Sequence, residues 1–571
     1  MIAVFKNYWS TPLRRHDIFL IGIMGVLAGC GLIYEYLMAH FAGRILGSVE
    51  STIFAMIGIM IVSMGMGSFY SRTIKCPFTG FAWIEVVIGL LGGLAVLIMA
   101  GVFAIAHTLP VMIREIYGID TSISIDGGWI DTLKHIAEAV PFFIGFTLGF
   151  LVGMEIPLIA RIREQLHEKH LVHNTGTIYG ADYIGAGIGA AIWVLVCLKI
   201  PIMEAAVATA AVNTLMGFCF LYRYRKHINN TLGLWVIHGV LACILVILFY
   251  NGQQWMRGLN NTLFQDQVAY SKKTHFQYLT ITERHLSARH PKVYSLYING
   301  RLQFASNDEG IYHSMLTYPA LLTSAKTNHV LVVGGGDGMA VRDILRWNPQ
   351  SITLADLDGG MLALFKGEDT EAPKAISDKL LELNEGALLD ERVTIIQGDA
   401  FKTVEQLVED GKLYDTIIVD LPDPSHPDLN KLYSDYFYGK LKELLNGDGV
   451  VAIQSTSPFH AKKAFLSIGK TLAASGFNTE QYHTNVPSFG EWGWTIGTKM
   501  GGSVTRRLAE LDSLPVANEF ISMPVINASF VFHPAFYSEI DTIDVNIMGS
   551  HATYQYHLSG WETGKGVFFN K

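Results

Sequence analysis

The residues best suited to chemistry follow a short apolar segment in the second half of the chain. Val330-Leu-Val-Val333 is rich in β-branched side chains and predicts a buried parallel strand. Gly334-Gly-Gly-Asp-Gly338 comes next, and residues 339–347 have the pattern of a helix. Strand, glycine turn and helix in this order open a Rossmann-like nucleotide site. The candidate cofactor-binding residues of this turn are Gly334, Gly336 and Gly338.

Asp337 is the unusual member of this turn. Its carboxylate would repel a phosphate or another carboxylate, and it suits a ligand that presents an ammonium group. The turn alone is a weak signal, because Met339 fills the last glycine position of the dinucleotide motif and a solvated aspartate in a tight turn also explains it. A second predicted strand, residues 351–357, delivers Asp356 about 20 residues beyond the glycines, where an acid can hold ribose hydroxyls.

A second pair of acids follows residues 414–419, another segment that predicts a buried strand. Asp420 and Asp423 should therefore lie at the carboxyl edge of the sheet, where ligands of such folds bind. Taken alone, the pair is better explained by an Asx-Pro turn. Beside Asp337 and Asp356, a binding role is favoured.

The order of these motifs resembles that of the spermidine synthase (polyamine aminopropyltransferase) family, in a form fused to an N-terminal multi-pass domain. The resemblance covers residues 265–500, and its pieces occur in the family's order. They are Gln277 within His275-Phe-Gln-Tyr278, Ile311-Tyr-His313, Gly334-Gly-Gly-Asp-Gly338, Asp356-Leu-Asp358, Gly398-Asp-Ala400, Asp420-Leu-Pro-Asp-Pro424, Leu432-Tyr433 and Pro487-Ser-Phe-Gly-Glu-Trp-Gly-Trp494.

The resemblance implies transfer of an aminopropyl group from decarboxylated S-adenosylmethionine, a co-substrate, to putrescine or a related amine. Spermidine and methylthioadenosine would be the products, and neither a permanently bound cofactor nor a metal is implied. The leaving group departs as a neutral thioether, so no general acid is needed. The attacking amine is an ammonium at neutral pH and must first lose a proton, which a nearby carboxylate can accept. By resemblance, Asp420 is this catalytic base.

The other roles carried over by resemblance concern binding. Asp356 would hold the ribose hydroxyls, and Asp399 would hold the adenine amino group. Asp337 would meet the aminopropyl ammonium, with Gln277 nearby. Trp492 is equally well explained as a buried aromatic residue in a glycine-rich turn. The residues expected to line the amine site are Asp423, Tyr312, His313 and Trp492.

The chain departs from the family pattern at three positions. Ser314 replaces a usual glutamate and Tyr318 a usual histidine, which leaves the identity of the acceptor amine open. Asp356 replaces a glutamate, which shortens the carboxylate and keeps its role. Two other classes of function stay open. One is an S-adenosylmethionine-dependent methyltransferase, against which Asp337 argues, and the other is a membrane polyamine transporter or sensor whose second half only binds ligand.

Composition divides the chain in two. Its 571 residues exceed one ordinary domain, and a mean hydropathy of +0.31 with 16% charged residues is unusual for a soluble enzyme. The net charge of -8 argues against a nucleic-acid partner and is compatible with cationic substrates. No CxxC spacing occurs, so neither a zinc site nor a disulfide framework is indicated. All cysteines lie in the apolar first half: Cys30, Cys76, Cys197, Cys219 and Cys243.

Seven apolar stretches in the first half are long enough to cross a lipid bilayer. They are residues 18–38, 53–70, 81–106, 137–159, 178–198, 203–221 and 232–250. We therefore expect a multi-pass protein of the cell membrane: an all-α transmembrane bundle of about seven spans, followed by a small β-domain and a Rossmann-like α/β fold of the methyltransferase type. The expected boundaries are 1–250 for the transmembrane domain, 251–266 for a polar linker, 267–310 for the small β-domain, 311–502 for the aminopropyltransferase domain and 503–571 for a C-terminal extension.

The basic residues near the ends of these stretches favour a cytoplasmic amino terminus. An odd number of spans would then place the catalytic half outside, whereas the supply of decarboxylated S-adenosylmethionine favours the cytoplasm. A re-entrant segment within residues 108–134 would reconcile the two. The basic residues on the side of the amino terminus are Lys6, Arg14, Arg15, Arg72, Lys75, Arg161, Arg163, Lys169, Arg223, Arg225 and Lys226, and those on the other side are Arg44, Arg114, Lys134 and Lys199.

Ionisable residues within the apolar stretches are candidates for a cation path, because buried charge in a bilayer is costly. Positions near span ends would explain most of them without a function. They are Glu35, Glu85, Glu155, Asp182, Glu204 and His238. In the tail, Phe530-Val-Phe-His-Pro-Ala535 is expected to pack onto the catalytic domain. A homo-oligomer is compatible with the sequence.

Overall fold

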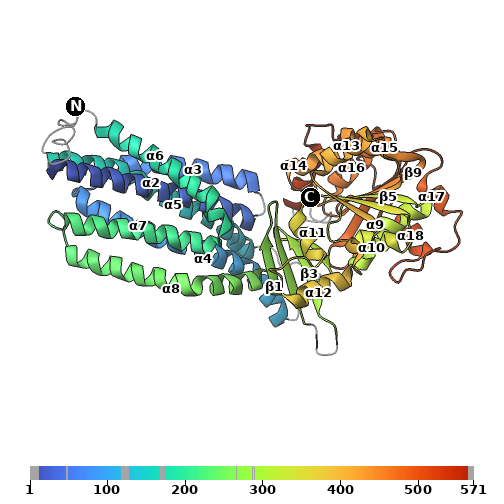
Figure 1. The fold of residues 1–571 in the computed structure, drawn as a ribbon, viewed down its shortest axis with the longest axis horizontal. Coiled ribbons are helices and arrows are strands. Elements are labelled where there is room, and N and C mark those ends of the chain that lie inside the picture. Colours follow the sequence, from blue (N-terminus) through green and yellow to red (C-terminus); the bar gives the residue numbers. More distant parts are fainter. Residues whose placement is uncertain are drawn as a thin grey trace. The chain divides into compact units, whose positions relative to one another are not determined.

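The computed structural model describes residues 12–46, 49–117, 128–167, 174–264, 266–285, 287 and 290–562. Contacts between residues divide the chain into two units, Met1–Val268 and Ala269–Lys571. Figure 1 shows long helices in the first unit, and sheets with shorter helices in the second. Each unit has its own hydrophobic core.

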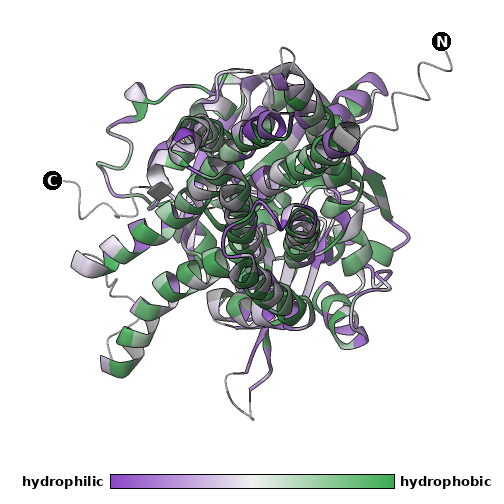
Figure 2. Cartoon of the chain, turned by 90° about the vertical axis from the view of Figure 1, so that its left-hand side faces the viewer, coloured by the Kyte–Doolittle hydropathy of each residue, from purple (hydrophilic) through white to green (hydrophobic). Residues whose placement is uncertain are grey.

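The described part of the first unit is helical. Each of the seven predicted apolar stretches falls within a helix, or a helix and its following turn, that is long and apolar enough to cross a membrane. Large apolar side chains such as Phe54, Phe143 and Tyr250 are exposed on these helices, which Figure 2 colours largely as hydrophobic. The helices are α2 (Pro12–Leu46), α3 (Val49–Tyr70), α4 (Pro77–Tyr117), α5 (Gly128–His167), α6 (Asn174–Leu195), α7 (Ile202–Tyr224) and α8 (Thr231–Phe264).

The predicted polar linker at 251–266 is helical over most of its length, since α8 continues without a break to Phe264. The segment contains Gln253, Met256 and Leu259, which are good helix formers, and it has no proline. The change from apolar to polar residues after Tyr250 therefore does not mark the end of the helix. The suggested re-entrant segment at 108–134 lies partly outside the described residues, since α4 ends at Tyr117 and α5 begins at Gly128.

The second unit begins with a four-stranded antiparallel sheet of order β1-β2-β3-β4. Asn299 and Gly300, with φ of 50° and 81°, form a tight hairpin turn between its last two strands, as the Asn-Gly pair favours. The strands are β1 (Gln267–Lys273), β2 (Tyr278–Arg284), β3 (Val293–Ile298) and β4 (Arg301–Ala305).

A seven-stranded sheet of order β10-β11-β9-β8-β5-β6-β7 forms the centre of the second unit. The five strands from β9 to β7 are parallel, and β10 and β11 add an antiparallel edge. The Rossmann-like prediction is thus confirmed. The strands are β5 (His329–Gly334), β6 (Ser351–Asp356), β7 (Val393–Gln397), β8 (Tyr414–Asp420), β9 (Leu445–Gln454), β10 (Asn478–Val486) and β11 (Gly490–Thr498).

Helices connect the parallel strands. Along the chain, β6 and β7 are added on one side of β5, and β8 and β9 on the other, so the direction in which strands are added changes between β5 and β8. Gly334 and Asp420 pair at the carboxyl ends of these two strands, so the glycine turn and the acidic loop meet at the point where open α/β sheets bind ligands. The helices of this region are α9 (Glu309–Thr323), α10 (Met339–Leu345), α11 (Gly359–Phe365), α12 (Lys374–Leu383), α13 (Ala400–Glu409), α14 (Pro427–Asn430), α15 (Asp435–Leu444) and α16 (Lys462–Ala474).

The tail, the C-terminal extension that begins at residue 503, packs on the rest of the second unit through aromatic side chains. The rings of Phe530 and Tyr482 are 4.9 Å apart, and those of Phe532 and Phe465 are 5.9 Å apart, as expected for the segment 530–535. The tail contains α17 (Val504–Leu508), α18 (Met523–Ser529) and α19 (Ala552–Glu562). Residues 563–571 of the predicted extension lie outside the described residues.

Candidate active site

Asp420 lies at the end of β8 with its side chain 10% exposed. The hydroxyl of Tyr312, on α9, donates to Asp420 Oδ1 at 2.8 Å, and His313 Nε2 lies 4.0 Å from Oδ2. Burial raises the pKa of the Asp420 carboxyl, while the charge of His313 and the hydrogen bond from Tyr312 oppose the shift. A carboxyl with a raised pKa is a better proton acceptor than an ordinary aspartate.

His313 is the end of a buried charged chain that the sequence did not reveal. Its Nδ1 lies 2.8 Å from Glu309 Oε2, and Arg342 Nη1 donates to Glu309 Oε1 at 2.8 Å. Burial would lower the pKa of His313, but the hydrogen bond and charge of Glu309 raise it to about 9. His313 is therefore a fixed positive charge behind Asp420 at neutral pH. The spacing of Glu309 and His313, four residues apart at a helix start, was the available signal.

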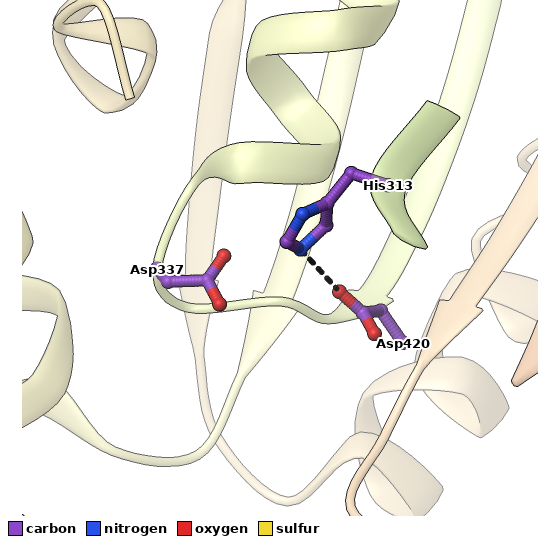
Figure 3. Close-up of side chains that lie close together, drawn as sticks. All are labelled: His313, Asp337 and Asp420. Carbon is purple, nitrogen blue, oxygen red and sulfur yellow. Dashed lines mark ion pairs between the residues drawn. The ribbon is translucent and has the colours of Figure 1, made fainter. Parts of the chain in front are cut away.

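His313, Asp337 and Asp420 meet at one point in Figure 3, where an oxygen or nitrogen of each lies within 4.8 Å of the others. Burial, followed by the charge of Asp420, raises the pKa of Asp337 to about 6, whereas the charge of His313 opposes the shift. The two carboxylates, Asp337 within the glycine turn and Asp420 at the end of β8, can each accept hydrogen bonds from an ammonium group.

The glycine turn has no room for larger residues. Gly334 and Gly338 have φ of 81° and 79°, which favours glycine. A Cβ on Gly336 would lie 2.8 Å from Asp356 Oδ2, so the carboxylate rests directly on the backbone of the turn. Burial raises the pKa of Asp356 to about 6, and hydrogen bonds from the backbone N–H groups of Asp358 and Gly336 oppose the shift.

The turn between β1 and β2 contacts the same corner. Thr274 Oγ1 donates to Asp358 Oδ2 at 2.7 Å, which ties the small sheet to the end of β6. The amide Nε2 of Gln277 lies 3.6 Å from Met361 Sδ, and no hydrogen bond to Asp337 is found among the described residues. Gln277 thus contacts α11, directly after the end of β6, and its predicted place near the aminopropyl ammonium stays a prediction.

Asp399 follows β7 and has two partners. It caps α13 by accepting from the backbone N–H of Phe401 at 2.9 Å, and it accepts from Lys431 Nζ at 2.7 Å. Burial raises its pKa, but these hydrogen bonds hold the pKa below the ordinary value. Lys431, which the sequence did not single out, therefore competes with any adenine amino group for this carboxylate.

The Asp423 carboxylate accepts hydrogen bonds from three side chains. Gln454 Nε2 donates to Oδ1 at 2.8 Å, and Thr456 Oγ1 and His557 Nε2 lie 3.3 Å and 3.1 Å from Oδ2. Burial raises its pKa, but the hydrogen bond and charge of His557 bring the pKa below the ordinary value. Thr456 has φ of 59°, a strained conformation for a β-branched residue. His557 belongs to the tail, in which no motif predicted a functional residue.

Trp492 is nearly buried at the edge of this site. Its ring lies 4.9 Å from that of Phe489, which in turn lies 5.9 Å from the ring of Tyr312. Its indole Nε1 has no hydrogen-bond partner among the described residues. Both predicted explanations are thus compatible with its position: it is a buried aromatic residue, and it belongs to the aromatic wall behind Tyr312.

The two departures on α9 face the tail. Asn518 Nδ2 donates to Ser314 Oγ at 2.8 Å, and the Tyr318 hydroxyl donates to the Ala517 carbonyl at 3.2 Å. Neighbouring residues of the C-terminal extension therefore occupy the surroundings of both positions. Both side chains therefore bond to the tail, and among the described residues no hydrogen bond joins either of them to Asp337 or Asp420.

Comparisons with known proteins agree with this geometry. A family described as "Spermine/spermidine synthase domain" matches residues 309–507. The chain is 51% identical to the polyamine aminopropyltransferase of Shewanella oneidensis over 551 residues, covering 96% of each chain. It is 30% identical to that of Oceanobacillus iheyensis over 512 residues, covering 88% of this chain and 90% of the relative. A solved spermidine synthase in complex with the transition state analogue AdoDATO superposes with a TM-score of 0.41 and 22% identity, over 48% of this chain and 88% of that chain.

Proposed function

Since the chain belongs to the polyamine aminopropyltransferase family, we propose that it transfers the aminopropyl group of decarboxylated S-adenosylmethionine to putrescine or a related primary amine. The observation that carries this proposal is the meeting of Asp337 and Asp420 beside the glycine turn. Asp337 would bind the aminopropyl ammonium of the donor. A carboxylated donor has an ammonium at the same carbon but adds a carboxylate, which Asp337 would repel. Asp420 would bind the attacking amine.

The reaction removes one proton from the acceptor ammonium and forms one bond to the methylene carbon beside the sulfonium. The acceptor ammonium donates to Asp420 and gives up its proton to that carboxylate. The freed amine attacks the methylene beside the sulfonium, so that a C–N bond forms, the C–S bond breaks and methylthioadenosine leaves as a neutral thioether. His313 stays protonated through Glu309 and holds Asp420 in place. The remaining acceleration comes from the alignment of nitrogen, carbon and sulfur.

Asp423 would bind the second ammonium of a diamine. Three donors fix its carboxylate, and its lowered pKa keeps it ionised at neutral pH. Asp356 would hold the ribose hydroxyls on the other side of the glycine turn. Asp399 would bind the adenine amino group in exchange for part of its contact with Lys431.

The helical unit would be inserted in the cell membrane, with lipid as its partner. Its seven long apolar helices and their exposed apolar side chains support this proposal. The amino terminus and the catalytic unit would then lie on opposite sides, because an odd number of crossings separates them.

The proposal is tested by incubating the detergent-purified chain with decarboxylated S-adenosylmethionine and single amines. Putrescine, cadaverine, agmatine, diaminopropane and spermidine would be compared by mass spectrometry of methylthioadenosine and of the amine product. We expect one amine to gain an aminopropyl group, and no methylation of any amine with S-adenosylmethionine. Binding of the nucleoside without any product would contradict the transfer and favour a sensor or transporter.

A further inference from the structure

We propose that the helical unit contains a binding site for an alkylammonium ion, separate from the catalytic centre. Four side chains form it: Tyr34 on α2, Glu85 on α4, Glu155 on α5 and His238 on α8. None of them takes part in the aminopropyl transfer described above. The class of ligand rests on the amine substrate proposed for the catalytic unit, whereas the site itself rests on the geometry of the helices.

The first observation is a set of buried polar atoms without partners. Tyr34, Glu85, Glu155 and His238 are each at most 1% exposed. Among the described residues, no hydrogen-bond partner is found for Tyr34 Oη, Glu85 Oε1, Glu155 Oε2 and His238 Nε2. Buried polar groups are normally hydrogen-bonded, and each unpaired one costs about 1–3 kcal/mol. The described helical unit has six such atoms, and these four are the ones that charged or aromatic side chains provide; together they point to a ligand.

The second observation is that these side chains surround one region. A Cβ on Gly217 would lie 2.7 Å from His238 Nε2 and 3.3 Å from Glu85 Cβ, so the two residues meet at this glycine. A Cβ on Gly92 would lie 2.7 Å from Tyr34 Oη. Gly92 follows Glu85 by two turns on the same face of α4. Glu155 lies within electrostatic range of both Tyr34 and Glu85.

Among the described residues, no ion pair balances the charge of Glu85 or Glu155. Glu85 Oε2 accepts a neutral hydrogen bond from Asn213 Nδ2 at 2.8 Å. Arg163, the buried basic residue of the helix that carries Glu155, is paired with Asp17 at 3.0 Å instead. A carboxylate in an apolar bundle must gain a proton or a cation.

The atoms offered suit an organic cation. His238 Nδ1 lies 2.9 Å from the Leu234 carbonyl, which can only accept, so Nε2 of the neutral ring is an acceptor. Carboxylate, phenol and imidazole acceptors can receive the three N–H donors of an ammonium group. Apolar side chains of the adjoining helix α7, such as Ala210 beside Gly93 of α4, would contact its methylene chain. A hard metal ion would require six or more oxygen ligands, which these side chains do not provide.

The experiment measures equilibrium binding of radiolabelled putrescine and spermidine to the full chain in lipid nanodiscs, without nucleoside. We expect two equivalents of amine per wild-type chain. Glu155→Gln and Glu85→Gln should each bind one equivalent and keep the wild-type rate of aminopropyl transfer, which also reports that the catalytic unit is folded. Glu204→Gln is the matched control, since Glu204 is a half-buried acid of α7 outside this cluster, and it should bind two equivalents.

Three results would overturn the inference. One is a single equivalent bound by the wild type, and another is two equivalents retained by both variants. The third is displacement of the second equivalent by sodium or potassium, but not by choline, at equal ionic strength, because this would identify a metal-ion site. Failure of the proposed transfer would be visible separately, as absence of product from a chain that still binds amine in its helical unit.

Discussion

The imidazole of His557 places its Nε2 3.1 Å from Oδ2 of Asp423, so the last described helix of the chain reaches an acid of the loop that follows β8. The His557 side chain is only 3% exposed, and the helix that carries it packs on α16. The C-terminal extension is therefore part of the catalytic unit. It orients an acid that was predicted to bind substrate.

Replacing His557 by alanine should weaken binding of the acceptor amine. His557 helps to hold the pKa of Asp423 below its ordinary value, so its loss raises that pKa and frees the carboxylate to rotate. A hydrogen bond to a charged group contributes about 1.5–3 kcal/mol, and we expect the KM for the amine to rise by about tenfold with a small change in kcat. His557→Gln, which keeps a donor, should recover part of the loss. His533→Ala, an exposed histidine of the same tail, serves as the control; a KM for His557→Ala equal to that of this control would contradict the role.

Catalysis should decline at acidic pH because of Asp337. Its folded-state pKa of about 6 is above the ordinary value, and the ionised form is the one that attracts the aminopropyl ammonium. As pH falls through 6, the acid is protonated and that attraction is lost. We expect kcat/KM for the donor to fall by about tenfold or more between pH 7.5 and 5. With one essential carboxylate, the ionised fraction falls by about a factor of ten per pH unit below its pKa. Asp337→Asn should reduce the slope of this decline and the preference for the decarboxylated donor. A rate profile that is flat down to about pH 5 would be incompatible with this assignment.

The contact between the glycine turn and Asp356 predicts that alanine at Gly336 weakens nucleoside binding, whereas alanine at Gly439, a glycine away from this contact, does not. In Gly336→Ala the new Cβ would lie 2.8 Å from Asp356 Oδ2 and would displace the carboxylate. Binding of the nucleoside by calorimetry should weaken by about tenfold or more. Gly439 lies in α15, and no atom lies within 4 Å of the position that a Cβ would take there, so Gly439→Ala should keep binding and add about 0.5–1 kcal/mol of stability. Equal nucleoside affinity in the two variants would disprove the steric role of Gly336.

The number of apolar helices predicts that the two ends of the chain are separated by the membrane. Seven helices of the described residues are long and apolar enough to cross a membrane, and seven crossings would place the amino terminus and the catalytic unit on opposite sides. Reporter fusions at the amino terminus and after residue 562, one active only in the cytoplasm and one only outside it, should give opposite signals. A cytoplasmic amino terminus would follow the distribution of basic residues, and a cytoplasmic catalytic unit would follow the supply of the donor. Two ends on the same side would show that one helix does not cross.

The acidic centre was predictable because its residues follow local patterns. Asp337 stands in a glycine turn, and Asp356 and Asp420 end apolar strands, so sequence alone placed them at one edge of the sheet. The β-strands with apolar runs were predicted for the same reason. The edge strand β10, whose residues are mostly polar, was not.

The residues that support the centre come from segments whose contacts only the folded chain defines. Glu309 and Lys431 were not predicted, although each bonds directly to a predicted site residue. His557 lies more than a hundred positions from Asp423, in a tail without a chemical motif. The contacts that Ser314 and Tyr318 make with Asn518 and Ala517 of the tail were likewise not predicted.

The most direct test of the account is the rate of Asp420→Asn in a single turnover with saturating donor and acceptor. Asparagine keeps the shape of the side chain and the partner of Tyr312, but it cannot accept the proton of the amine. We expect transfer by Asp420→Asn to slow by about 10²- to 10⁴-fold. Its nucleoside binding should stay within about threefold of the wild type, roughly 0.7 kcal/mol. The control Asp428→Asn, on the nearby helix α14, should react at the wild-type rate. Transfer by Asp420→Asn at the wild-type rate would contradict the assignment of Asp420 as the base and, with it, the mechanism.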